Sequence, residues 1–573
     1  MKKRNWLKRG SALVFGVLAA FSLGCFTGFA ADDSASLETC IIQDRSRIVV
    51  TGSAVPEGMS APSVSTVMPQ NVTDVSTVPE GALADDGYYY LFELQPYEIS
   101  IGSRTDYAAW SNKATNLSFE IPYTGDEEDS RLYSRFVAAQ KIGDTYYEIS
   151  NPIYITNPED MASYTAEFPR TDSKKGLLIE LDMIQDAMQL GVKHTTINIP
   201  YHHMIGGNLK YQYNGKTYYF NEELIASYDK MVSTFSNKGI VVTAILLNGW
   251  NETHPELHEA GLAKSDTANY YGFNVSTKEG FETTRALLSF MAERYSGESS
   301  AHGRISNWII GNEINNNQDW NYVGPMDVES YTKLYEKSFR VAYTAIKSQS
   351  KNSRVYFSTD YEWRRENTKL KYAARDVIDL FAAGIRSEGD IDWGLAYHPY
   401  PHPLTEPEFW DDDLTGAEND TNDTPVLNFK NLDVLTNYFQ RAELLSPNGR
   451  VRHIILSEEG FTAMSPTRGP VFMEQAAAFA YAYYLVDANP YIDAFILNRQ
   501  VDAVSEYNAS LAFGLYTVDT SRLDKVIPVF SRPIYNVFKY IDTSRSLKYT
   551  EFAKEIIGIN KWSDVIPGFK LKE

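Results

Sequence analysis

Two short segments of the sequence place carboxylates directly behind apolar runs. In WIIGNEIN, three large apolar side chains and a glycine precede Asn312 and Glu313. In IILSEEG, the apolar run and a serine are followed by Glu458 and Glu459. A carboxylate at the tip of a buried strand is costly to desolvate unless it is paired or hydrogen-bonded, so both segments suggest chemistry.

Two carboxylates that face each other across a pocket can break a glycosidic bond. One must be protonated to give a proton to the leaving oxygen, and the other must be ionised to attack the anomeric carbon. Burial and a neighbouring negative charge both raise proton affinity, so one carboxyl of such a pair stays protonated near neutral pH. A separation of about 5 Å gives retention through a covalent sugar ester, whereas a wider gap admits water and gives inversion.

From about residue 172 the chain alternates apolar strands with helix-length amphipathic segments. The predicted strands are 176–181, 193–199, 239–247, 305–313, 354–360, 392–400, 452–460 and 491–500. The predicted helices end at 191 or span 222–237, 278–295, 329–348, 373–384, 431–444, 471–487 and 533–541. Such strand–helix units over residues 172–545 are typical of an α/β fold, the (β/α)8 TIM barrel with insertions. An open doubly wound sheet is the alternative, but no glycine-rich phosphate loop follows an early strand.

A barrel brings the carboxyl ends of its strands to one mouth. We therefore expect the polar residues at the predicted strand ends to surround a single site. In strand order from the second strand, these residues are Asn198, Asn248 with Trp250, Asn312 with Glu313, Asp360 with Tyr361, His398 with Tyr400, Glu458 with Glu459, and Asn498 with Arg499. Trp250 and Trp320 lie in rim segments and are candidate platforms for sugar rings, with packing beneath the loops as the alternative.

Three motifs resemble those of a known group of enzymes. GNE at the end of the fourth strand, HPY at the end of the sixth and SEEG at the end of the seventh together resemble glycoside hydrolase clan A, the cellulase-like TIM-barrel glycosidases. The resemblance implies that Glu313 is the acid/base and Glu458 the nucleophile. It also implies that Tyr400 hydrogen-bonds the nucleophile, that Asn312 contacts the sugar 2-hydroxyl, and that His398 lines the sugar site.

The run KKGLLIELDMIQDAMQLGVKH and the N-terminal β region are similar to a family of secreted bacterial proteins that lies near this clan and carries a domain of unknown function. The chain departs from the clan on two strands. Many clan members carry an arginine on strand two and a sugar-stacking tryptophan on strand eight, whereas this chain has KHTTINI and FILNRQ. We therefore expect a differently built sugar subsite, with Asn198, Trp250, Trp320 and Arg499 as substrate-binding candidates.

The two adjacent glutamates of the seventh strand are not equivalent. Neighbouring residues of a strand point to opposite sides, so only one of Glu458 and Glu459 can face the site. Alternation alone does not choose between them, and the resemblance favours Glu458. We interpret Glu459 as a supporting or ion-paired residue.

A metal hydrolase is an alternative because histidines occur in local pairs. These pairs are His202 with His203, His254 with His258, and His398 with His402. None forms the HExxH pattern, and the oxygen-rich run ENDTNDT lacks the spacing of a calcium loop. We therefore expect no metal and no other cofactor, and we interpret ENDTNDT as a solvated acidic loop.

The first thirty residues have the pattern of a secretory signal peptide. A basic start precedes a mostly apolar stretch, and Gly28-Phe29-Ala30 offers small residues for cleavage after Ala30. Cys25 follows Ser-Leu-Gly, a poor lipoprotein motif, so lipid anchoring is the lesser alternative. No later segment has the length and apolarity of a membrane span. These features predict a secreted or cell-surface protein.

The net charge of the chain limits the kinds of molecule that it can bind. The first thirty residues carry five basic and no acidic side chains, so their removal changes the net charge from −21 to −26. Such acidity excludes attraction to nucleic acid and to anionic lipid, and a neutral substrate or a surface partner fits better. The resemblance implies that the substrate is a polysaccharide or oligosaccharide. Only Cys40 remains after cleavage, so no intramolecular disulfide is expected.

The remaining regions complete the predicted organisation. Residues 36–156 contain short β-branched and aromatic runs between Pro, Gly, Asn and Asp clusters, which predicts a small β-sandwich accessory domain. It serves either packing or sugar binding. Residues 546–573 form a C-terminal extension. The sequence thus favours a secreted retaining glycoside hydrolase acting on β-linked glycans, and the alternative is an inactive barrel that binds surface polysaccharide.

Overall fold

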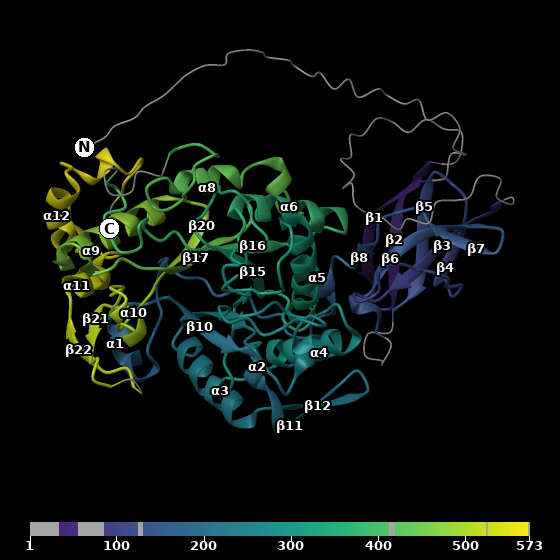
Figure 1. Ribbon diagram of the computed structural model, residues 1–573, viewed down its shortest axis with the longest axis horizontal. Coiled ribbons are helices and arrows are strands. Elements are labelled where there is room, and N and C mark those ends of the chain that lie inside the picture. Colours follow the sequence, from purple (N-terminus) through teal and green to yellow (C-terminus); the bar gives the residue numbers. More distant parts are fainter. Residues whose placement is uncertain (1–33, 56–84, 124–129, 412–418, 523–524, 571–573) are drawn as a thin grey trace, which may run out of the picture.

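The computed structural model describes residues 34–55, 85–123, 130–411, 419–522 and 525–570. An N-terminal β domain lies beside a larger barrel domain (Figure 1). The predicted signal peptide, with Cys25, lies outside the described residues. Within these ranges, no helix is both long enough and apolar enough to cross a membrane.

Eight parallel strands close into a barrel in the described part of the chain, which confirms the predicted fold. In order around the barrel they are β9 (Lys175–Leu177), β10 (His194–Pro200), β13 (Val241–Leu247), β14 (Asn307–Ile310), β15 (Arg354–Thr359), β16 (Trp393–Tyr397), β17 (Ile454–Glu459) and β20 (Ile492–Leu497). Their sequence order equals their spatial order, so their carboxyl ends form one mouth.

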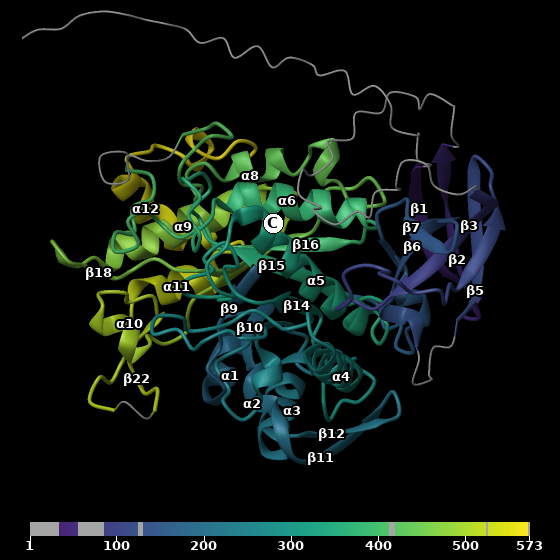
Figure 2. The ribbon, with the colours of Figure 1, turned by 45° about the vertical axis from the view of Figure 1, so that its right-hand side comes forward.

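The helices between these strands surround the barrel (Figures 1 and 2). They are α1 (Ile184–Gln189), α3 (Glu222–Ser236), α4 (Lys278–Arg294), α5 (Val328–Lys347), α6 (Ala374–Ser387), α8 (Leu432–Tyr438), α9 (Phe472–Ala488) and α11 (Pro533–Tyr540). Asn221, Thr277 and Asp327 cap α3, α4 and α5, because each side chain accepts a backbone N–H from the third residue beyond it.

Both faces of the barrel strands are buried, which explains why they read as continuous apolar runs. Alternate residues fill the barrel interior: Ile245, Leu247, Ile309, Tyr356, Ala396, Ile455, Ala494 and Ile496. The residues between them, such as Leu246 and Ile310, belong to the larger core beneath the helices. The interior is therefore packed, and polar chemistry is confined to the strand ends.

The N-terminal domain contains two small antiparallel sheets. One joins β1 (Ser34–Gln43), β2 (Arg47–Val55) and β5 (Asn116–Pro122), and the other joins β3 (Asp85–Leu94), β4 (Ala109–Asn112), β6 (Arg135–Ile142), β7 (Thr145–Glu148) and β8 (Ile153–Tyr154). The sheets lie against each other in Figure 2, and Val50, Leu91 and Phe119 contribute to their buried core. The backbone N–H of Tyr154 donates to the carbonyl of Glu388 beyond α6, which ties this domain to the barrel.

Two elements differ from the predicted layout. A hairpin of β11 (Ile205–Tyr213) and β12 (Lys216–Phe220) stands between β10 and α3. Its turn holds Asn214 and Gly215 at positive φ, the conformation that an Asn-Gly pair adopts readily in a tight hairpin turn. In the C-terminal extension, α12 (Ser546–Ile557) packs on α9, and Thr550 Oγ1 lies 3.1 Å from the Tyr484 hydroxyl.

A buried ion pair holds the long segment that follows β20. Arg532 Nη1 donates to Asp502 Oδ1 at 2.9 Å, and both side chains are almost completely buried. We expect Asp502→Ala to lower the free energy of unfolding by about 3–5 kcal/mol, because it leaves the guanidinium charge buried without its partner. Urea unfolding measures this loss. Asp423→Ala is the control, because it removes an exposed partner of Arg375 and should lower the free energy of unfolding by less than about 1 kcal/mol. Equal losses in the two variants would contradict the account.

Candidate active site

Glu313 lies at the mouth, three residues beyond the end of β14. Its backbone N–H donates to Ser358 Oγ at 2.8 Å, and its φ is 38°. This left-handed conformation is uncommon for a residue with a side chain and is held here by the neighbouring strand. The side chain is 15% exposed, and Oε1 lies 2.9 Å from Nδ1 of His398. The carboxyl group is therefore fixed in place yet accessible.

His398 connects the two halves of the site. Its ring is fully buried, with Nδ1 toward Glu313 and Nε2 3.0 Å from Ser457 Oγ on β17. Burial disfavours the charged ring, but the hydrogen bond with Glu313 and the charges of Glu458, Glu313 and Asp360 outweigh it and raise the pKa of His398 above its ordinary value. His398, which was predicted to line the sugar site, therefore contacts Glu313 directly.

Glu458 lies at the end of β17 and is partly exposed. The hydroxyl of Tyr400 donates to Glu458 Oε1 at 3.0 Å, and Asn498 Nδ2 donates to the same hydroxyl at 3.1 Å. Tyr400 is buried, and burial together with the Glu458 charge raises its pKa well above the ordinary value, so it stays a neutral donor. The chain of hydrogen bonds from Asn498 through Tyr400 orients the carboxyl group of Glu458.

An irregularity in β17 decides which glutamate reaches the mouth. Opposite β20, Leu456 pairs with Phe495 and Glu459 pairs with Leu497, so β17 uses one more residue than its neighbour. Such a bulge breaks the alternation of side chains and re-aims one of them. Ser457 and Glu458 both reach groups of the mouth, whereas Glu459 is fully buried.

In the described part of the chain, no side chain neutralises a negative charge on Glu459. Among the described residues, neither of its carboxyl oxygens has a hydrogen-bond partner of normal geometry. Burial, and then the charge of Glu458, raise the pKa of Glu459 well above its ordinary value, and the nearby backbone of Ile496 opposes this only in part. Glu459 is therefore a neutral carboxylic acid in the native protein at neutral pH, and the predicted ion pair does not form.

Replacing Glu459 by glutamine is expected to change the pH dependence of stability. The unfolded chain ionises Glu459 above its ordinary pKa of 4.5 while the native chain keeps it protonated, so stability falls as pH rises beyond that value. Glu459→Gln removes this fall, which amounts to at most about 1.4 kcal/mol per pH unit. Urea unfolding between pH 5 and pH 8 measures it. The exposed Glu223→Gln is the control, and identical slopes in all three proteins would refute the assignment.

Asp360 is a further carboxylate of the mouth. It follows β15, and Oδ1 accepts hydrogen bonds from Asn315 Nδ2 at 2.7 Å and from the backbone N–H of Glu362 at 2.9 Å. Burial and the charge of Glu313 raise the pKa of Asp360 to about 7. The mouth thus holds three carboxyl groups, those of Glu313, Asp360 and Glu458, around one imidazole.

The remaining predicted substrate residues occupy different positions. Asn312 is buried, and its Oδ1 lacks a hydrogen-bond partner among the described residues, which suits a group that awaits a ligand. Asn198 is exposed, and its pairing with Ile245 places it on the inner side of the barrel. Arg499 lies 3.5 Å from Glu180 and 3.7 Å from Glu506, so its charge is already balanced within the protein.

The two predicted tryptophan platforms each have an aromatic neighbour. Trp250 stacks on His258 with ring centroids 4.5 Å apart, and Trp320 stacks on Tyr270 at 6.0 Å. Burial lowers the pKa of His258 to about 4, so this histidine is neutral. In the described ranges, no group of three His, Cys, Asp or Glu side chains could hold a metal ion.

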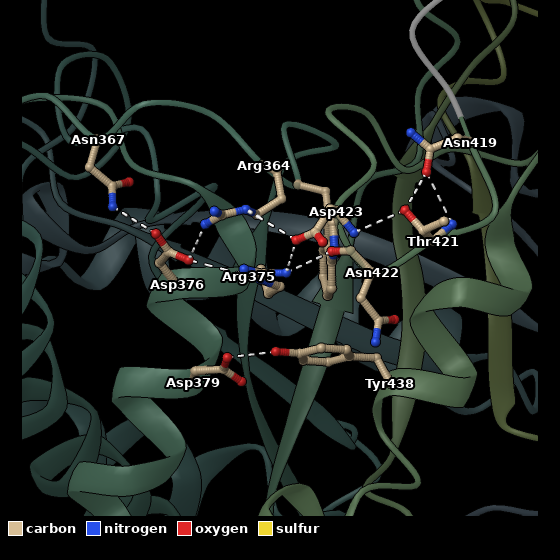
Figure 3. Close-up of polar contacts among 11 residues, drawn as sticks. Arg364, Asn367, Arg375, Asp376, Asp379, Asn419, Thr421, Asn422, Asp423 and Tyr438 are labelled. Atoms are coloured by element: carbon tan, nitrogen blue, oxygen red, sulfur yellow. Dashed lines mark hydrogen bonds and ion pairs between the residues drawn. The ribbon is translucent and has the colours of Figure 1, made fainter. Parts of the chain in front are cut away.

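Ion pairs stabilise the rim beside the mouth (Figure 3). In the run ENDTNDT, Glu418 lies outside the described residues, residues 419–423 are exposed and Thr424 is buried. Asp423 accepts from Arg375 at 2.8 Å. Arg375 stands on α6 next to Asp376, which accepts from Arg364 at 2.9 Å. Tyr438 donates from α8 to Asp379 at 2.5 Å. The predicted solvation therefore holds for residues 419–423 alone, and these residues are also attached to the loop and helix that follow Asp360.

Three residues of the site were not among the sequence-based candidates: Asn315, Ser457 and Glu506. Asp360 and Asn498 were expected at the mouth, but no role there was predicted for them. Both stand at predicted strand ends, so the sequence indicates their place at the mouth but not their contacts. Ser457 and Asn315 emerge only from contacts between strands that are distant in the sequence.

The fold and the site define a (β/α)8-barrel protein with carboxylates at the ends of its fourth and seventh strands. Two solved structures with similar chains are a family 1 β-glucosidase from Thermotoga maritima and an exo-β-1,4-mannosidase from Opitutaceae bacterium strain TAV5. The first has 13% identity and a TM-score of 0.40, covering 63% of this chain and 85% of that one. The second has 13% identity and a TM-score of 0.38, covering 68% and 59%.

The family of the chain follows from a second comparison. Residues 167–565 match the model of a family of unknown function, DUF5722, and the chain belongs to this family. The match includes the whole barrel and α12. None of the curated proteins matches the chain.

Proposed function

We propose that the protein is a retaining glycoside hydrolase that cleaves β-linked glycans. The observation that carries the proposal is the pair of differently held carboxyls at one mouth. Glu458 accepts a hydrogen bond from a neutral tyrosine, and Glu313 contacts His398 and lies near Asp360. The tyrosine hydroxyl fixes the orientation of one carboxyl group, and the buried imidazole of His398 fixes that of the other.

These environments give each glutamate a role. Ionised Glu458 attacks the anomeric carbon while Glu313 gives its proton to the departing glycosidic oxygen, so the leaving alcohol departs neutral. A sugar ester on Glu458 remains. Water then attacks the same carbon, Glu313 takes the proton from that water, and the ester bond to Glu458 breaks. Both carboxyl groups return to their starting forms.

The surroundings favour a neutral sugar. Near the two glutamates stand the acidic side chains of Asp360 and Glu506, whereas the charge of Arg499 is shared between Glu180 and Glu506. A sugar carboxylate or sulfate would meet net repulsion here. Asn312 Oδ1 can accept a hydrogen bond from a sugar hydroxyl, and Asn198 presents a second amide on the same side.

Screening the purified protein on aryl β-glycosides and neutral polysaccharides tests the proposal. We expect hydrolysis, with the β-anomer as the first product in proton NMR. An α-anomer as first product would contradict retention. Binding of a glycan without turnover over long incubation would favour the polysaccharide-binding alternative, and loss of activity on chelation would favour a metal hydrolase.

We also propose that the protein is exported. Residues 1–30 support this by their basic start, apolar stretch and small residues before the cleavage point. Expression of the full chain in a bacterium, followed by N-terminal sequencing of the extracellular protein, tests it. A mature start at Ala31 is expected, and retention of the intact chain in the cytoplasm would contradict export.

A further inference from the structure

The sheet that contains β3, β4, β6 and β7 carries aromatic rings on the face that turns away from its partner sheet. Along β3, Tyr89 and Leu91 belong to the core between the two sheets, so alternation places Tyr88 and Tyr90 on the opposite face. A separate small core lies on that face and consists of Tyr90, Phe92, Leu94, Ile101, Val137, Ala139 and Tyr146. In both views, β3 lies on the side of the N-terminal domain that is farther from the barrel (Figures 1 and 2).

Three rings on this face remain partly open to solvent. The exposed fraction is 56% for Trp110, 37% for Tyr88 and 40% for Tyr107, and we call these three residues the aromatic platform. The ring centroids of Tyr88 and Trp110 lie 5.0 Å apart, and that of Tyr107 lies 4.8 Å from the buried Tyr90. Among the described residues only two other aromatic side chains are exposed, on β12 and β22. The platform is therefore a cluster of rings and not a chance scatter of single ones.

The exposed area of the aromatic platform suits a small flat group. A Tyr or Trp side chain has about 150–250 Å² to bury, so the exposed parts of the three rings come to about 200–330 Å². A stable interface between proteins buries about 800 Å² on each partner. The platform alone is therefore too small to hold a second copy of this chain or another folded protein, whereas a few sugar rings would cover it.

The charged groups beside the aromatic platform are already paired. Lys113 forms an ion pair with Asp85 at the start of β3. Asp86 accepts from the Tyr90 hydroxyl at 2.6 Å and from the Tyr88 backbone N–H at 3.1 Å. The bases of nucleic acid also stack on aromatic rings, but their phosphates need a basic groove. Carboxylates beside the rings and the net charge of −21 would repel phosphate, so a neutral ligand fits the platform.

Polar groups border the rings of the platform. Asn112 pairs with Tyr88, two positions beyond Trp110 on the same face, and it is exposed, so its amide can donate to and accept from a hydroxyl. Asp86 is also exposed, and its oxygens keep lone pairs for further donors. A sugar ring has an apolar C–H face and hydroxyls around its edge. Aromatic rings bordered by hydrogen-bonding groups match both parts.

We propose that the aromatic platform of the N-terminal domain binds a neutral glycan chain whose equatorial hydroxyls leave flat apolar ring faces. The sugar rings stack on Trp110 and Tyr88, and their hydroxyls reach Asn112 and Asp86. Contacts between the platform rings hold them in place before the ligand arrives, so little conformational entropy is lost on binding. This site lies outside the barrel and does not depend on catalysis at the mouth. It would keep the protein on a polysaccharide while the mouth acts.

Affinity electrophoresis of the purified full-length protein, in native gels that contain hydroxyethylcellulose, glucomannan or arabinoxylan, tests the proposal. We expect retardation by at least one of these neutral polymers and none by polygalacturonate, because its carboxylates meet like charge. Trp110→Ala should weaken the binding by about tenfold or more, whereas Trp110→Phe, which keeps a ring, should stay within about threefold. Tyr219→Ala removes an exposed ring from β12 and is the matched control that should bind as the wild type does.

Further measurements separate this site from the mouth. Trp110 is exposed and stands on β4, so Trp110→Ala should unfold at the wild-type temperature and hydrolyse small aryl glycosides at the wild-type rate. Equal retardation of Trp110→Ala and wild type, or no retardation by any neutral polymer, would overturn the proposal. A wild-type dimer that Trp110→Ala converts to a monomer in analytical ultracentrifugation would also overturn it, because a second copy would then cover the platform. A wild-type protein that binds through Trp110 without turnover would support the platform and contradict only the proposed function.

Discussion

Replacing Glu458 by alanine is expected to reduce hydrolysis by about four to six orders of magnitude while the protein stays folded, because the covalent route loses its nucleophile. Glu458 is partly exposed and accepts a hydrogen bond from Tyr400 at the mouth, so its removal leaves the barrel core intact. Steady-state rates on an aryl glycoside, with thermal unfolding as the test of folding, measure the effect.

The neighbouring glutamate provides the matched control for this variant. Glu459→Gln alters a buried neutral side chain on the other side of the strand and should keep activity within about tenfold. Azide should restore turnover in Glu458→Ala by attacking the anomeric carbon from the vacated side, which gives an α-glycosyl azide. Wild-type rates in Glu458→Ala, or loss of activity only in Glu459→Gln, would reverse the assignment.

Replacing Glu313 by glutamine is expected to slow hydrolysis of glycosides with poor leaving groups by about 10²–10⁴-fold, because the amide cannot give a proton. Glutamine keeps the length of the side chain and can still contact His398. The first step on a dinitrophenyl glycoside should be nearly unaffected.

The exposed rim residue Glu366 serves as the control for Glu313. Glu366→Gln makes the same chemical change on the loop after β15 and should leave rates and pH profile unchanged. Azide added to Glu313→Gln should yield a β-glycosyl azide, since the ester on Glu458 still forms. Equal losses on good and poor leaving groups would show that Glu313 binds substrate but does not transfer a proton.

The barrel could be predicted from the sequence because its strands are buried on both faces. Segments such as GIVVTAILL read as uninterrupted apolar runs, and helices with capping residues such as Asn221 and Thr277 separate them. The positions of Glu313 and Tyr400 at strand ends followed from the same pattern. The N-terminal sheets were recognisable from β-branched runs and turn residues, although β1 and β4 were not assigned.

The choice between Glu458 and Glu459 could not be predicted from alternation. Alternation assumes a regular ladder, and β17 carries an extra residue opposite β20. Ile455 faces the barrel interior, and Ser457, two residues further on, contacts His398 as alternation requires. Because of the extra residue, the next side chain, Glu458, also turns to the mouth and contacts Tyr400. Only the pairing with a strand forty residues away reveals this.

The position of Asp360 at the mouth was predicted, but its burial and its hydrogen bonds were not, for a different reason. A lone aspartate after a strand is common in loops, and nothing local marks it as buried. Its environment comes from Asn315, which is 45 residues away in the sequence, and from the charge of Glu313. Long-range contacts of this kind carry the electrostatics of a site, so residue type and spacing alone do not disclose them.

The most direct test of the central claim is the identity of the residue that carries the covalent sugar. The protein is inactivated with a 2-deoxy-2-fluoroglycosyl fluoride of a sugar it hydrolyses, and the peptide containing Ser457 to Gly460 is sequenced by tandem mass spectrometry. We predict one sugar on Glu458 and none on Glu459. A label on Glu459, or inactivation without any label in this peptide, would contradict the account.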